Sequence, residues 1–510
     1  MVVLLAAFTV LATVCVAAVS AAPRHSDATG GTLTYISANA PFAGGLDPAA
    51  GNSTQGAFTQ LAYDPLIVQK SDGSFAPGLA LSWKYGYRNK SFSMKLRPGV
   101  KFSDGRALNA RAVRDWLNYA LKLPGGGASQ YIKGLTKIKL DGPLSLTLNF
   151  NVPTPLLPLI LSQGFTVGSP ASPAAIAAKT LATQTTGAGQ YVLDPKQTVV
   201  GDTYTYLPNP TYWNKSAVYW KKVVVKVITN PATALQALKA GEAQVAASQP
   251  AGNIAAATSS GLKTSTALSL MFAWILGDRG GALSKPLGDV RVRQALNYAI
   301  DRVAIAKALG AGYGKPIHQM AIEGDDSYVP ALKNAYPYNP TKAKALLAQA
   351  GYPNGFSFSA TGVPFIGLDT MSQALKAQLA QVGVDVKLDI LDAGTFFGGV
   401  LGRKYSAHTV SWGRGPAAIQ YPNLWGPSAA FGNPFDSRNA QISKLYYKMI
   451  QAPEAQGRAA AQDTMKVLTE QAWFLPVFAG AGATFYSPKV TGIVTTPQRF
   501  PYAVEVRPAG

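Results

Sequence analysis

The chain is 510 residues long, with 47% hydrophobic and 14% charged residues, which excludes an intrinsically disordered protein and allows two or three domains with sizeable cores. Its 50 glycines and 35 prolines recur without a period, which excludes collagen-like and low-complexity classes. Lys and Arg outnumber Asp and Glu by 46 to 25, a net charge of +21 that favours an anionic partner or surface.

The N-terminus carries the pattern of an export signal. Residues 2–18 form an apolar run, and small residues and the polar segment His25-Ser26-Asp27 follow it. This order predicts a signal peptide over residues 1–21 and a periplasmic or extracellular protein. An uncleaved membrane anchor is the alternative, although the run is at the short limit for a span. No Lys or Arg precedes the run, so Met1 need not be the true start.

The only cysteine, Cys15, lies within this apolar run, so the exported chain would contain no disulfide. Val14 directly before it argues against a lipoprotein cysteine. No later segment reaches the length of about 18 apolar residues that a membrane span needs.

The first well-defined elements form a strand, a turn and a helix. Residues 31–37 and 91–97 predict strands, the second with Phe92, Met94 and Leu96 on one buried face. Asp104-Gly105 predicts a turn, because Gly accepts a positive φ, and Asn109 is an N-cap for the helix that follows. These elements are a piece of an α/β domain. The apolar face of the helix contains Val113, Trp116, Leu117 and Ala120.

Further elements follow along the chain. Residues 55–62 predict a short helix, residues 144–150 a strand with one buried face, and residues 223–228 a strand buried on both faces. Four more helices are predicted over residues 231–240, 289–302, 338–352 and 375–382, with a strand directly after the last.

The order of residues in several segments resembles one protein family. The matching runs are PGLALSW at 77–83, FSMKLRPGVKFSDGRALNARAV at 92–113, NPTYWN at 209–214, DVRVRQALNYAIDR at 289–302, YNPTKAKALLAQAGY at 338–352 and AWFLPV at 472–477. Together they are similar to solute-binding family 5, the peptide, opine and nickel class of extracellular solute-binding proteins of bacterial ABC importers. The chain departs from the family pattern at Ala188, Gln190 and Gln244.

The resemblance implies a two-lobe α/β fold, the class II type of periplasmic binding protein, with an extra subdomain inserted in the first lobe. Lobe I would comprise residues 22–60, 187–270 and 476–510, the inserted subdomain residues 61–186, and lobe II residues 271–475. The lobes would close at a hinge around the solute, and the permease would recognise the closed form.

No residue pattern for catalysis stands out. His25, His318 and His408 are isolated, and the chain contains no H-E-x-x-H, P-loop or G-x-S-x-G motif. Apart from His25 near the N-terminus, the exported chain would contain two histidines and no cysteine, which makes a transition-metal site unexpected. We therefore expect a binding protein that is not an enzyme and uses no cofactor or metal. A secreted hydrolase is the alternative, because carboxylate pairs assemble through space.

The segment after residue 409 bears on the ligand. In peptide-binding members of the family, an Asp three residues after a Trp pairs with the free α-amine of the peptide. Here Gly415 follows Trp412 at that spacing, which removes the carboxylate partner of an ammonium group. Arg414 could present its guanidinium to a carboxylate or phosphate, or lie solvated at the surface. Residues 359–368, where dipeptide binders place a carboxylate-pairing Arg, contain no basic residue.

The remaining ligand candidates are aromatic. Trp274, Trp412, Tyr421 and Trp425 could stack on sugars, nucleobases or blocked peptides, although each is also an ordinary core residue. With Arg414 and Gly415 they form the predicted ligand-binding set. We expect a peptide-like or other small organic solute without a free amine. The alternatives are an oligosaccharide, opine or other anion, or a ligand sensor on the same fold.

The basic residues do not predict a nucleic-acid partner. The densest groups, Lys133, Lys137, Lys139 and Lys221-Lys222, are not interleaved with aromatic residues, and the chain carries an export signal. A solvated basic surface is the simplest explanation, and attraction to an anionic membrane face or to anionic solutes is the alternative. We expect a monomer whose partners are its solute and the membrane subunits of an ABC permease.

Overall fold

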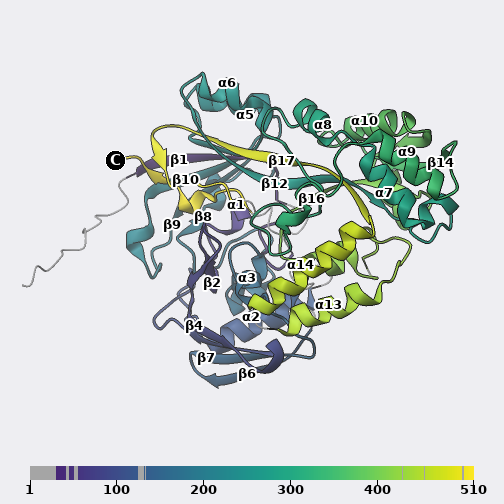
Figure 1. Ribbon diagram of the computed structural model, residues 1–510. Helices are drawn as coiled ribbons and strands as arrows, with labels where there is room; N and C mark the ends of the chain where they lie inside the picture. The colour runs from purple at the N-terminus through teal and green to yellow at the C-terminus, as the bar shows by residue number, and fades with distance from the viewer. Residues whose placement is uncertain are drawn as a thin grey trace, which may run out of the picture.

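The computed structural model of the chain describes residues 30–41, 45–50, 56–123, 131–132, 134–427, 429–452, 454–496 and 499–510 (Figure 1). The predicted signal peptide, Cys15, His25 and Lys133 lie outside these residues. None of the helices in the described ranges combines the length and the apolar character that a bilayer span needs.

A mixed sheet, with 11 strands among the described residues, runs through the molecule. Its order is β15 (Val384–Ile390), β14 (Phe356–Gly362), β16 (Ala407–Gly413), β12 (Lys263–Leu276), β17 (Phe474–Tyr486), β11 (Val245–Pro250), β1 (Gly30–Ser37), β10 (Trp220–Val227), β9 (Thr203–Pro208) and β8 (Tyr191–Leu193), with β13 (Lys315–Pro316) beside β17. In one half β14 lies parallel to β15 and β16, and in the other β1 lies parallel to β10 and β11. The sheet therefore has two parallel groups, which antiparallel strands β12 and β17 separate.

The long strands β12 and β17 join the two halves. They contain 14 and 13 residues, which is about 45 Å of strand at the usual rise. The beginning of β12 pairs with the end of β17, where Lys263 lies opposite Tyr486, and that end of β17 also pairs with β11. From Leu270 onward β12 pairs on its other edge with β16. One strand pair thus belongs to both halves.

The half that contains β1 is covered on both faces, as expected of parallel strands. Leu33 and Tyr35 enter one core, whereas Ile36 enters another beneath α5 (Pro231–Lys239) and α6 (Ile254–Thr258). The strands predicted over residues 31–37 and 223–228 are β1 and β10, and they pair side by side.

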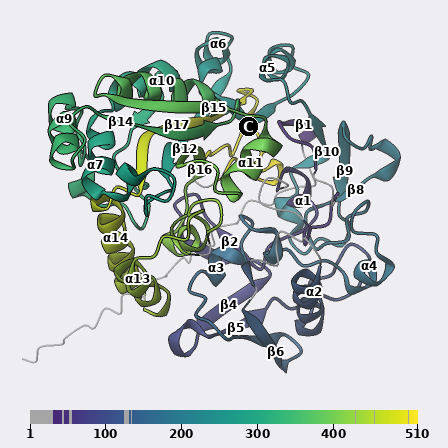
Figure 2. The ribbon, with the colours of Figure 1, turned by 90° about the vertical axis from the view of Figure 1, so that its right-hand side faces the viewer.

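In the other half, alternate residues of β12 enter two separate cores. Phe272, Trp274 and Leu276 pack with α7, α9 and α10, whereas Met271 and Ala273 pack on the opposite face with α13 and α14. Figures 1 and 2 both show α13 and α14 side by side below α7. The helices of this half are α7 (Val290–Tyr298), α8 (Arg302–Leu309), α9 (Pro340–Gln349), α10 (Leu368–Ala380), α11 (Ala393–Leu401), α12 (Ala417–Gln420), α13 (Ala440–Gln451) and α14 (Glu454–Glu470).

Three of the predicted helices differ from the observed ones. The helix predicted over residues 289–302 is α7 but ends earlier, at Tyr298. A second helix, α8, begins at Arg302, where Asp301 caps it with its carboxylate 2.9 Å from the amide of Ala304. The helix predicted over residues 375–382 begins earlier, at Leu368. The helix predicted over residues 55–62 is the single turn α1 (Gly56–Thr59). Shorter elements are β2 (Ile67–Gln69), β3 (Phe75–Pro77), α3 (Leu157–Ile160), α4 (Pro173–Ala178), β18 (Val490–Thr491) and β19 (Arg507–Pro508).

A separate antiparallel sheet contains β4 (Ala80–Tyr85), β5 (Ser91–Leu96), β7 (Ser145–Phe150) and β6 (Leu135–Gly142) in that order. The alternation predicted for residues 91–97 is confirmed in β5, whose apolar residues enter a core with α2 (Ala110–Lys122). The predicted N-cap is also confirmed, since Asn109 Oδ1 lies 3.0 Å from the amide of Ala112. Both views show this sheet at the lower edge of the molecule.

Candidate ligand-binding site

The carboxyl ends of the parallel strands define the candidate site, because ligands of open α/β sheets bind outside these ends. In one half the chain leaves β1 after Ser37 and β11 after Pro250. In the other half it leaves β14 after Gly362 and β15 after Ile390. β16 pairs with β14 only through its first two residues and then continues along β12, so its end projects past the other two strands.

The projecting end of β16 carries three of the six predicted ligand residues. Trp412 lies beside Met271 of β12 and is partly buried. Arg414 and Gly415 follow at the end of the strand, and Gly415 is partly exposed. Trp412, Arg414 and Gly415 therefore lie together at the candidate site, and their ligand contacts stay predictions.

The guanidinium of Arg414 is already engaged by the protein. Its Nε lies 2.8 Å from Oδ1 of Asp325, and both side chains are only 4% exposed. Its Nη2 donates to the carbonyl of Glu323 at 2.7 Å and its Nη1 to the carbonyl of Leu268 at 3.3 Å. Burial raises the pKa of Asp325, and the charge of Arg414 acts against that rise. The interpretation of Arg414 as a solvated surface residue is wrong.

Position 415 has room for a side chain but lacks one. A Cβ on Gly415 would meet a single group within 4 Å, the side-chain nitrogen Nε2 of Gln420 at 3.5 Å. Another carboxylate, that of Asp326, lies close by and accepts from the amide of Ala417 at 3.0 Å. Burial raises the pKa of Asp326 to about 6. Sequence reasoning missed both Asp325 and Asp326, because Asp325 and Arg414 lie 89 positions apart in the chain and no local pattern links them.

Trp274 lies in the core beneath α10, away from the end of β16. Its ring is fully buried, its Nε1 donates to Oγ of Ser372 at 3.0 Å, and Phe358 meets it edge-on at 6.4 Å. Its polar atom is satisfied within the protein. The predicted ligand contact of Trp274 stays a prediction, and its surroundings do not support it.

Tyr421 and Trp425 lie on the segment that follows α12, and both are buried. Tyr421 stacks on Tyr446 of α13 with ring centroids 3.8 Å apart, and its hydroxyl lies 3.3 Å from Oγ of Ser443. Trp425 packs in the core between β12 and α14. These contacts give both rings a packing role, and their predicted ligand contacts also stay predictions.

Exposed apolar residues at the strand ends were not predicted. Phe365 and Ile366 follow β14 and Phe397 lies on α11 after β15, and each is about half exposed. Ile366 has a φ of 44°, which is rare for a β-branched residue. Phe397 lies 5.4 Å from Phe431 between ring centroids. The run Val363-Pro364-Phe365-Ile366 directly after a strand was the sequence signal for this apolar rim.

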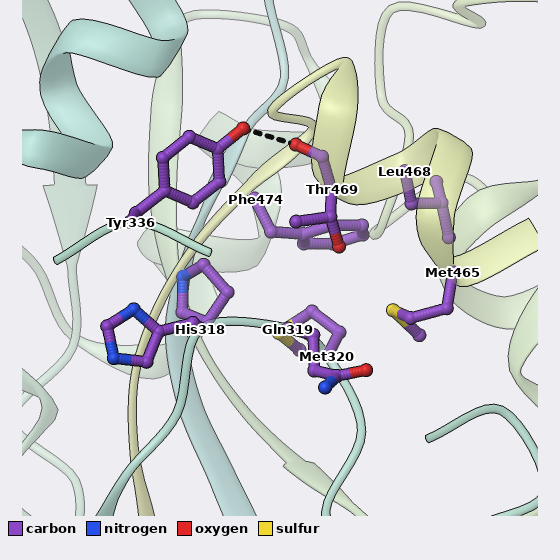
Figure 3. Close-up of a pocket in the computed structure, with 9 residues that line it drawn as sticks. His318, Gln319, Met320, Tyr336, Met465, Leu468, Thr469 and Phe474 are labelled. Carbon is purple, nitrogen blue, oxygen red and sulfur yellow. Dashed lines mark hydrogen bonds between the residues drawn. The ribbon is translucent and has the colours of Figure 1, made fainter. Parts of the chain in front are cut away.

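The small cavity in Figure 3 lies elsewhere, between the carboxyl-terminal part of α14 and β17. Its lining includes His318, Tyr336 and Phe474, and Tyr336 donates to the carbonyl of Thr469. Its volume of about 10 Å³ is at the threshold for one water molecule, so it cannot hold an organic solute. Burial and the nearby Arg302 lower the pKa of His318 to about 4. Among the described residues no group of three or more His, Cys, Asp or Glu side chains could hold a metal ion.

Known proteins are similar to this chain in sequence and in fold. The family model "Bacterial extracellular solute-binding proteins, family 5 Middle" matches residues 74–433. Glutathione-binding protein GsiB of Escherichia coli O1:K1 / APEC is 27% identical over 480 residues, which cover 89% of this chain and 90% of that protein. GsiB of Salmonella typhimurium (strain LT2) is 30% identical over 360 residues, 68% of each. HbpA2 from Haemophilus parasuis aligns with a TM-score of 0.81 at 23% identity, over 94% of this chain and all of that one. Such likenesses confirm the expected two-lobe α/β fold.

Proposed function

Because the chain belongs to the bacterial extracellular solute-binding proteins, family 5, and is a solute receptor of the ABC-importer type, we propose that its cargo is a peptide-like or other small organic solute without a free ammonium group. The two lobes would close around this solute and present it to the membrane permease. The end of β16 and the apolar rim of Phe365, Ile366 and Phe397 would form the lobe II side of the site.

The chemistry at the end of β16 supports this proposal. Position 415 has no carboxylate, so a buried solute ammonium would lose its hydration without a charge-assisted partner there. Arg414 would have to exchange Asp325 or a main-chain carbonyl for a solute carboxylate. An uncharged solute group needs no carboxylate partner at position 415 and no release of Arg414 from its present partners. Aromatic rings at Phe397 and Trp412 offer it stacking and apolar contact instead.

The glutathione named in the two relatives contains a free amine, so it is the sharpest challenge to this proposal. Asp326 is the carboxylate that could replace the missing one, since it lies beside the segment that follows Gly415. Binding of glutathione through its amine would therefore require Asp326.

Thermal unfolding with a ligand panel tests the proposal. The panel contains free-amine peptides, N-acetylated peptides, oligosaccharides, opines and glutathione. A ligand at 100 times its dissociation constant adds about 2.7 kcal/mol of stability. We expect shifts with blocked or uncharged compounds only. A shift with free-amine peptides that disappears in Asp326→Asn would overturn the proposal and identify Asp326 as the substitute acid.

We also propose that the protein binds its solute without converting it, acts as a monomer, and takes no nucleic acid. Two observations support binding without conversion. His318 and His408 are isolated from each other, and burial lowers the pKa of His408 to about 3, which keeps its imidazole neutral. Mass spectrometry of the solute after incubation tests it, with an unchanged mass as the expected result. A new mass would support the hydrolase alternative.

The expected lobe boundaries remain part of the proposal. The separate sheet of β4, β5, β7 and β6 lies within residues 61–186 and shares one core with α2, which supports an inserted subdomain there. The family description places relatives outside the cytoplasm, which supports an export signal over residues 1–21. N-terminal sequencing of the exported protein tests the signal, and a first residue near Ala22 is expected.

A further inference from the structure

The separate sheet has one face in the core and one face in solvent. Its strand register places Lys84, Ser93, Thr147 and Lys139 in a row across β4, β5, β7 and β6. In the row on one side Lys95 lies between Ser82 and Ser145, and in the row on the other side Lys137 of β6 lies opposite Asn149, which pairs with Ser91. Four lysines therefore share the solvent face, and small polar residues separate them. We name Lys84, Lys95, Lys137 and Lys139 the lysine face.

The charges of the lysine face are almost unopposed. All four lysines are exposed. One carboxylate lies among them: Asp141, which is 2.8 Å from Nζ of Lys139 and accepts from Oγ1 of Thr147 at 2.6 Å. The lysines lie on three of the four strands, β4, β5 and β6, so the positive charge is distributed across the face rather than gathered at a point.

The hairpin turn between β4 and β5 adds to this surface. Arg88 and Lys90 are exposed there, and Tyr87 is 76% exposed with the guanidinium of Arg88 5.0 Å from its ring centre. A tyrosine beside basic residues is typical of protein segments at a membrane interface, where its ring is partly apolar and its hydroxyl stays hydrated.

We propose that the lysine face docks on a membrane surface that contains acidic phospholipid. Four lysines against one aspartate, in a chain of net charge +21, are complementary to a plane of anionic headgroups. Lysine ammonium groups on flexible stems suit mobile headgroups, whereas bidentate recognition of one fixed phosphate favours arginine. The face carries no aromatic platform on which nucleobases could stack. Docking would concentrate a solute receptor at the surface where its permease lies.

Vesicle co-sedimentation tests the proposal. The full chain is mixed with vesicles of phosphatidylcholine and phosphatidylglycerol, or of phosphatidylcholine alone. A lysine near an anionic surface contributes about fivefold to binding, so the quadruple variant Lys84→Gln, Lys95→Gln, Lys137→Gln and Lys139→Gln is expected to lose at least a hundredfold. Raising the ionic strength from about 0.1 M to about 1 M shortens the screening length from about 10 Å to about 3 Å and should also release the protein.

A matched variant separates the lysine face from net charge. Lys307→Gln, Lys333→Gln, Lys344→Gln and Lys387→Gln remove the same charge from exposed positions of the other half, one of them on a strand. This variant is expected to bind acidic vesicles within a few-fold of the wild type. Replacement of the lysine face by arginine should keep binding, and thermal unfolding checks that every variant is folded.

Three results would overturn the proposal. One is equal loss of binding in the two quadruple variants, which would assign the attraction to total charge. Another is equal binding to vesicles with and without phosphatidylglycerol. The third is tighter binding to a short DNA duplex than to acidic vesicles at the same ionic strength, because the occupant would then be a nucleic acid.

Discussion

Removal of the Asp325 carboxylate is expected to destabilise the protein strongly. In Asp325→Ala the Arg414 guanidinium loses the carboxylate 2.8 Å from its Nε. Both side chains are only 4% exposed, so water does not replace the lost partner. At an effective dielectric constant of about 20, unit charges at that separation attract by ~6 kcal/mol. Part of this attraction offsets desolvation, and loss of one partner from a buried pair costs ~3–5 kcal/mol. The carbonyls of Leu268 and Glu323 still hold the guanidinium but do not neutralise it.

Urea unfolding of the ligand-free protein measures this loss. Asp463→Ala is the matched control, because Asp463 pairs with Lys466 at 2.9 Å but both side chains are about half exposed. The control should change stability by less than ~0.5 kcal/mol. The double variant Asp325→Leu with Arg414→Met replaces the pair by apolar groups and should recover most of the loss.

A loss below ~1 kcal/mol in Asp325→Ala, similar to that of Asp463→Ala, would refute the reasoning. It would mean that water reaches the Arg414 guanidinium and that a solute anion could do the same. The argument that Arg414 is not free to bind a solute carboxylate would then lose its support.

Three further changes test other buried contacts. Burial raises the pKa of Asp64 to about 6, so the folded protein binds a proton at this carboxylate more tightly than the unfolded chain does. The free energy of unfolding should therefore rise by up to ~3 kcal/mol as the pH falls from about 7 to about 4, and this rise should be absent in Asp64→Asn. Trp274→Ala removes a fully buried ring and the partner of Ser372, and should cost ~3–5 kcal/mol in urea unfolding. Asn89→Gly keeps the positive φ of the β4–β5 turn but removes the amide contacts to the last carbonyls of α13, and should weaken that contact by ~1–2 kcal/mol.

Different measurements decide these three cases. For Asp64, equal pH dependence in the wild type and the Asn variant would contradict a buried carboxylate. For Trp274, the control is Tyr87→Ala at an exposed position, and a similar small effect of both changes would place the indole outside the core. For Asn89, hydrogen exchange in the last turn of α13 is the measurement, and unchanged exchange would show that the turn does not hold the helix end.

Local patterns in the sequence were sufficient for most elements. The alternation of Phe92, Met94 and Leu96 predicted the buried face of β5, and Asn109 predicted the start of α2, because both signals act within a few residues. The same locality explains why the helix predicted over residues 289–302 extends past the end of α7 at Tyr298 to the first residue of α8. Its apolar face continues through both helices, and the cap at Asp301 was hidden inside an apparently continuous pattern.

By itself, the sequence determined the family, the α/β class and the missing carboxylate at Gly415, since these depend on residue order and identity. Only the tertiary structure decided what Arg414 does, because its partner Asp325 lies 89 positions away and no periodicity links them. It likewise assigned Trp274 to the core and gathered Lys84 and Lys139 on one face. Burial, ion pairing and shared faces arise when strands distant in sequence pair in space, whereas strand and helix patterns arise from neighbours along the chain.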